Sequence, residues 1–125
     1  MSDTPPSQDL DLSFLYEIAD GSDEFIVDSI GMFLEQTPQL IELIDSAINA
    51  HDWSSAASAA HKLKPNLGFF GMPLSQANIQ EVEIQCKSGT PNPDEVIAKF
   101  NQVKEVVNAN LVELNKIKTE KEANL

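Results

Sequence analysis

Residues 53–72 have the sequence WSSAASAAHKLKPNLGFFGM, which predicts an amphipathic helix. On a helix that turns by about 100° per residue, its apolar side chains gather on one face. That face is formed by Trp53, Ala56, Ala60, Leu63, Leu67 and Phe70. His61 lies far from the centre of this face, towards solvent, and Gly71 and Met72 end the helix. The stretch therefore predicts a core-facing helix that carries an exposed histidine.

The surroundings of His61 suit a nucleophile. Most residues that share its direction on the helix are compact, namely Ser54, Ala57, Ser58, Pro65 and Gly68. A neutral imidazole nitrogen can take up a phosphoryl group, and Lys64, one turn further on, could balance the charge of that group. Helix periodicity alone favours the alternative of an ordinary surface histidine beside a solvated lysine, because exposed histidines are common.

The chain before this stretch predicts two more helices. A short apolar segment from Leu10 to Ala19 predicts a small first helix, which Gly21 is suited to stop. A second helix begins at Ser22 or Asp23, with acidic residues in its first turn. Pro38 interrupts the pattern, because proline lacks an amide hydrogen. We therefore expect either one long kinked helix or two helices nearly in line.

The chain after it predicts another two helices. One runs from about residue 74 to 87, and the last begins at residues 92–95, Asn-Pro-Asp-Glu, which is a strong helix start. Because every connection is short, the predicted fold is all-α, an antiparallel four-helix bundle with a short additional N-terminal helix. We expect the bundle domain to span residues 10–118, between a flexible tail at 1–9 and a polar tail at 119–125.

Charge and composition exclude several classes of function. The formal net charge is −12, with eight lysines and no arginine, so the chain lacks the basic surface that nucleic acids or acidic membranes require. The first cations along the chain are Lys62 and Lys64, beside His61. The single cysteine, Cys86, has no partner for a disulfide or a metal, and we expect neither metal nor cofactor. With no signal peptide and no spanning segment in the sequence, we expect a cytoplasmic location. We also expect a monomer.

Residues 60–71, AHKLKPNLGFFG, resemble the signature of histidine-containing phosphotransfer (HPt) domains. That signature is A-H-x-L-K-G, with a further glycine ten residues after the histidine. Upstream residues fit the same family, namely Gly21 to Phe25, Phe33, Pro38, Leu40, Ala47 and Asp52-Trp53. The resemblance covers about residues 10–115. It implies that His61 accepts the phosphoryl group, that Lys64 supports it, and that Gly71 marks the tight end of the active helix.

The chain departs from the family pattern at two positions. Pro65 stands where the family usually has glycine; it is also compact, and we expect a local bend because it removes the amide that would reach the His61 carbonyl. Glu83 stands where relatives often have a glutamine that bonds the imidazole. Its carboxylate could orient the ring, or it could point away to avoid repelling the phosphoryl group and leave Gln80 to help.

The resemblance also implies partners, the receiver domains of response regulators and hybrid histidine kinases. Phe69, Met72, Ile26 and Ile30 are candidates for docking, and each could instead pack in the core. The sequence has no glycine-rich phosphate loop, so we expect a phosphoryl carrier that does not phosphorylate itself. The competing interpretation is a helical adaptor that binds receivers without carrying phosphate. The short polar ends favour a free-standing protein over a piece of a hybrid kinase.

Overall fold

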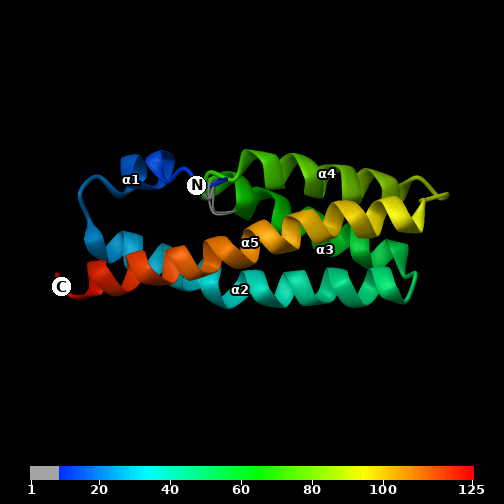
Figure 1. Ribbon diagram of the computed structural model, residues 1–125. Coiled ribbons are helices and arrows are strands. Elements are labelled where there is room, and N and C mark those ends of the chain that lie inside the picture. Colours follow the sequence, from blue (N-terminus) through cyan, green and yellow to red (C-terminus); the bar gives the residue numbers. More distant parts are fainter. Residues whose placement is uncertain (1–8) are drawn as a thin grey trace, which may run out of the picture.

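The computed structural model describes residues 9–125, and within this range the regular structure is entirely helical. The predicted tail at residues 1–9 therefore lies, apart from Asp9, outside the described residues. Five helices follow one another along the chain (Figure 1). They are α1 (Ser13–Ala19), α2 (Asp23–Asn49), α3 (Trp53–Phe69), α4 (Pro73–Lys87) and α5 (Pro93–Glu122).

Helices α2, α3, α4 and α5 form an antiparallel bundle. Each packs against two others, in the cyclic order α2, α3, α4, α5 and back to α2. In Figure 1, α2 and α5 extend beyond α3 and α4 at one end of the bundle, and α1 lies beside this extension. Helix α1 packs mainly on α2. The predicted fold class, a four-helix bundle with a short additional N-terminal helix, is confirmed.

Three helices begin at a residue whose side chain caps the helix; the sequence indicates two of these caps, Ser22 and Asn92, and the structure adds Asp52. The side chains of Ser22, Asp52 and Asn92 accept hydrogen bonds from backbone amides three residues further on, at 3.1, 3.2 and 3.2 Å. Such caps satisfy amides that have no partner within the helix. Helices α4 and α5 also start with proline, which loses no hydrogen bond in the first turn.

The two long helices differ from the sequence-based expectation in detail. Helix α2 is one continuous helix with Pro38 inside it, so the alternative of two separate helices was wrong. Helix α5 continues to Glu122, so residues 119–122 of the polar segment at 119–125 belong to the last helix. Two ion pairs stabilise the last turns of α5. Lys118 pairs with Glu122 one turn away at 2.9 Å, and Lys121 pairs with Asp23 of α2 at 3.4 Å.

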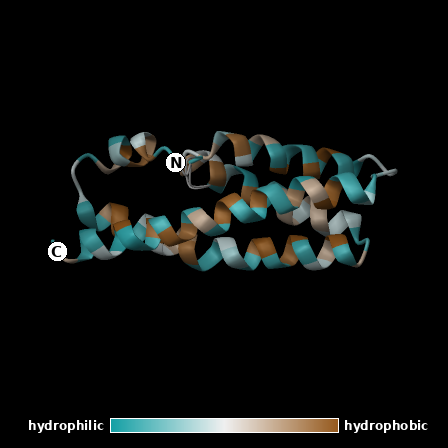
Figure 2. Ribbon diagram, in the orientation of Figure 1, coloured by the Kyte–Doolittle hydropathy of each residue, from teal (hydrophilic) through white to brown (hydrophobic). Residues whose placement is uncertain are grey.

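Apolar side chains from all five helices meet in a single core. Hydrophobic residues recur along each helix of the bundle (Figure 2), as expected for helices that each bury one face. Among the largest fully buried side chains are Leu15, Ile30, Ile44, Leu63, Ile79 and Phe100. Leu15 belongs to α1, which explains how so short a helix is held in place. Among residues 9–125, no helix combines the length and the apolar character needed to cross a membrane.

The segment before α1 is tied to the turn between α3 and α4. The carboxylate of Asp9 accepts hydrogen bonds from the amides of Leu74 and Ser75, at 3.1 and 2.8 Å, and so caps α4. The amide of Asp11 donates to the carbonyl of Gly71 at 2.8 Å. Gly71 has a φ of +67°, and a Cβ there would overlap the backbone oxygen of Asp11. The tight end of α3 therefore requires glycine, for conformation and for space.

Candidate functional site

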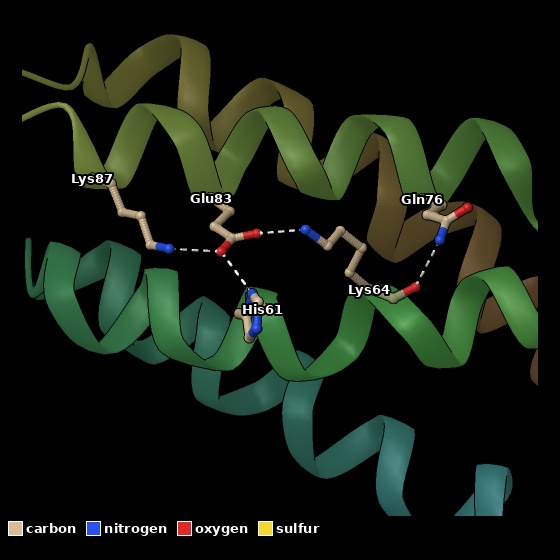
Figure 3. A network of polar contacts seen from close by, with 5 residues as sticks. All are labelled: His61, Lys64, Gln76, Glu83 and Lys87. Atoms are coloured by element: carbon tan, nitrogen blue, oxygen red, sulfur yellow. Dashed lines mark hydrogen bonds and ion pairs between the residues drawn. The ribbon is translucent and has the colours of Figure 1, made fainter.

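His61 projects from the middle of α3 towards α4. Its side chain is 66% exposed, as the helix periodicity predicts. The Nδ1 atom lies 2.9 Å from Oε2 of Glu83 on α4 (Figure 3). This contact joins the two helices and holds one edge of the imidazole. The other ring nitrogen, Nε2, makes no protein hydrogen bond among the described residues.

Glu83 is the buried centre of a polar network. Its side chain is 7% exposed, and its carboxylate accepts from three donors, His61 Nδ1, Lys64 Nζ at 3.1 Å and Lys87 Nζ at 2.9 Å (Figure 3). Burial acts to raise the pKa of Glu83, but the hydrogen bonds from Lys87, Lys64 and His61 and the charge of Lys64 together lower it to about 2. Glu83 is therefore ionised at neutral pH despite its burial.

An ionised Glu83 determines which nitrogen of His61 carries the proton. A carboxylate accepts but cannot donate, so its contact with Nδ1 requires an N–H at that atom. In the neutral ring the lone pair is then on Nε2. The network thus presents an exposed, nucleophilic nitrogen whose orientation is set by a buried partner.

Pro65 and Gln76 affect the hydrogen bonding of the α3 backbone beside His61. Pro65 has no amide to donate to the carbonyl of His61, yet α3 continues through it to Phe69. At Lys64, three residues after His61, the backbone carbonyl accepts a hydrogen bond at 3.4 Å from the side chain of Gln76 on α4 (Figure 3). Gly68 makes room for this contact, because a Cβ there would come within 2.5 Å of the Gln76 amide nitrogen. Gly68 therefore leaves space for the Gln76 side chain beside the site.

A shallow pocket of about 550 Å³ lies beside His61, between α3 and the C-terminal end of α4. The small residues Ser54, Ala57 and Ser58 form its α3 wall, and Cys86 and Lys87 contribute from α4. Burial raises the pKa of the Cys86 thiol, which makes that thiol a poor nucleophile. Between the imidazole and the thiol that line this pocket, the imidazole is therefore the better nucleophile.

The comparisons with known proteins agree with this geometry. The family model for the Hpt domain matches residues 28–114, which include α3 and its histidine. The chain belongs to the Hpt domain family. This Hpt domain is thus a phosphotransfer module of two-component phosphorelays, a class that carries phosphoryl groups and is distinct from the kinases.

One solved structure has the same fold as this Hpt domain. It is the crystal structure of the HPT domain from the Hpt sensor hybrid histidine kinase from Shewanella. The two structures superpose with a TM-score of 0.60 at 24% sequence identity, and the match covers 95% of each chain. A search of curated proteins gave no match.

Several predicted site residues of the Hpt domain come together and others do not. His61, Lys64 and Glu83 meet in one network, with Glu83 pointing to the imidazole, so the alternative in which it points away was wrong. Gln80 is exposed and lies outside that network in the described structure, so it does not replace Glu83. Among residues 9–125, no group of three His, Cys, Asp or Glu side chains could hold a metal ion.

The predicted docking residues are mostly core residues. Met72 and Ile30 are fully buried and Ile26 is 4% exposed, so the prediction that these three form a docking surface was wrong. The helix faces that carry them point into the bundle. Residue spacing alone did not show whether these faces point into the core or towards a partner. Phe69 is half-buried and packs edge-to-face on Phe14, which is 49% exposed. Phe69 therefore remains a candidate for receiver contact.

Sequence reasoning missed Lys87 and Gln76. Lys87 follows Glu83 by four residues, a spacing that places both on the same side of a helix and is a readable signal. The contact of Gln76 depends on how α4 is placed against α3, and no local pattern in the sequence reports this.

Proposed function

We propose that this Hpt domain accepts a phosphoryl group on Nε2 of His61 from a receiver-domain aspartate and passes it to a second receiver domain. The observation that carries the proposal is the hydrogen bond between His61 Nδ1 and Glu83. It leaves the lone pair of Nε2 facing the solvent side of α3, where a partner can approach. The compact residues around the ring support such an approach.

The chemistry of the first step balances without an added cofactor. The Nε2 lone pair attacks the phosphorus of the aspartyl phosphate, the N–P bond forms, and the P–O bond to the aspartate breaks to release its carboxylate. The ring keeps its Nδ1 proton and so becomes cationic when Nε2 is substituted. The Glu83 carboxylate, 2.9 Å from Nδ1, stabilises this developing positive charge.

The second step is the reverse reaction with a different receiver. The aspartate of that receiver attacks the phosphorus, the N–P bond breaks, and its electrons return to Nε2. In this proposal Lys64 helps to balance the charge of the phosphoryl oxygens through both steps, and the position of its ammonium group, at the same carboxylate as the ring, supports the role. We further propose that the domain acts as a monomer in the cytoplasm, with Phe69 among the residues that meet the receiver.

Labelled transfer from receivers tests this proposal. Receiver domains phosphorylated with a radioactive label are mixed with the parent, with His61→Gln and with His51→Gln. His51 is the other histidine of the chain and stacks on Trp53 in the turn before α3, which makes it a matched control. We expect an acid-labile label on the parent and on His51→Gln, and none on His61→Gln. Receivers that bind the folded parent without labelling it across a broad panel would support the adaptor alternative and refute the proposal.

A further inference from the structure

The buried carboxylate of Glu83 performs two opposing electrostatic roles at the phosphorylation site. It holds the Nδ1 proton and so orients His61, but a negative charge this close to the ring also repels an incoming phosphoryl group. That group carries about two negative charges at neutral pH. Lys64 contacts Oε1 of the carboxylate, and this ion pair alone has no net charge, so Lys64 by itself cannot both cancel the charge of Glu83 and balance that of the phosphoryl group.

A second cation changes this balance. The ammonium group of Lys87 lies 2.9 Å from Oε2 of Glu83, the same oxygen that accepts from His61 Nδ1. Lys87 is also part of the wall of the pocket beside His61. With both lysines in place, the carboxylate and the two ammonium groups have one net positive charge beside a neutral ring. Figure 3 shows His61, Lys64 and Lys87 converging on the carboxylate from three directions.

We propose that Lys87 is a positioning residue for phosphotransfer, which neutralises Glu83 so that this carboxylate can orient His61 without repelling the phosphoryl group. The inference rests on the proposed function of His61. Lys87 acts through Glu83: its side chain is 61% exposed, and its contact in the described structure is with that carboxylate. The role of Lys87 should therefore depend on the charge at position 83.

A double-mutant cycle tests this dependence. The rate of labelled transfer from a saturating receiver is measured for the parent, Lys87→Gln, Glu83→Gln and the double variant. We expect Lys87→Gln to slow transfer about fivefold in the parent, a size that corresponds to about 1 kcal/mol. In the Glu83→Gln background the same substitution should slow transfer less than about twofold, because there is no carboxylate charge to neutralise.

Two further variants separate charge from structure. Lys87→Arg keeps a cation beside Glu83 and should restore most of the parental rate. Lys99→Gln is the matched control, since it removes the same charge from an ion pair with Glu81 at 3.0 Å on another side of α4 and should transfer at the parental rate. Equal slowing by Lys87→Gln in both backgrounds, or no slowing in either, would overturn the role of Lys87. Either result would leave the proposed function intact as long as the parent is labelled on His61, whereas an unlabelled parent refutes the function itself.

Discussion

Replacing Glu83 with glutamine should change how the stability of the bundle depends on pH. The pKa of Glu83 falls from its ordinary value of 4.5 to about 2 on folding, because three donors outweigh the effect of burial. A carboxyl group with a lowered pKa in the folded state stabilises that state above its unfolded pKa, near pH 4.5, and this contribution is lost as the pH falls towards 2. Glutamine does not titrate and has no such dependence.

The magnitude follows from the size of the shift. One pKa unit corresponds to about 1.4 kcal/mol, so a shift from 4.5 to about 2 gives a full contribution of at most about 3–4 kcal/mol. Most of it is present at pH 5. Between pH 5 and pH 3 we expect the free energy of unfolding of the parent to fall by about 2 kcal/mol more than that of Glu83→Gln.

Urea denaturation at a series of pH values, followed by circular dichroism, measures this difference. Comparison with the variant cancels the titration of the remaining carboxylates, provided that they do not interact with position 83. Glu81→Gln is the control, because Glu81 is 53% exposed and lies two residues away on α4. Its pH dependence should stay close to that of the parent. A constant difference between parent and Glu83→Gln from pH 5 to pH 3 would contradict the view that a buried, ionised carboxylate holds the network together.

Two further variants test the turn after α3 and the role of Lys64. Gly71→Ala should lower the free energy of unfolding by about 2–3 kcal/mol, because alanine is strained in the left-handed conformation and its Cβ would displace the contact with Asp11. The control is Gly21→Ala, where φ is also positive but the space is open, and it should lower the free energy of unfolding by only about 1 kcal/mol. Equal losses for the two variants in chemical denaturation would refute the steric argument. Lys64→Ala should slow labelled transfer about tenfold and leave the helix content unchanged. The control is Lys104→Ala, which removes a lysine that pairs with Asp45 between α5 and α2 and should transfer at the parental rate. Equal rates for Lys64→Ala and the parent would remove Lys64 from the mechanism.

Much of the fold could be predicted from the sequence because its signals are local. Capping residues such as Asn92 and the apolar spacing of each helix depend on neighbours a few positions away, and the structure has helices where these signals lie. The continuous path of α2 through Pro38 could not be predicted in this way. Helix α2 packs against α3 and α5 and has buried side chains both before and after the proline, such as Phe33 and Ile41, so its support comes from distant parts of the chain.

At the site, too, features that depend on neighbouring residues could be predicted, and features that depend on how the helices pack could not. The exposure of His61 follows from its place on the helix, and its role followed from the resemblance of its surroundings to the Hpt signature. The orientation of Glu83 remained open, because it depends on the rotation of α4 against α3. The same lack of tertiary information explains why Met72 and Ile30 were taken as docking candidates although both are fully buried.

Locating the phosphoryl group on the imidazole ring tests the central claim most directly. The domain is labelled with ¹⁵N histidine, phosphorylated by a receiver, and examined by NMR for coupling between ³¹P and the ring nitrogens. With Nδ1 held by Glu83, we predict coupling to Nε2 of His61 and a retained proton on Nδ1. Coupling to Nδ1, or phosphorylation at any residue other than His61, would contradict the account.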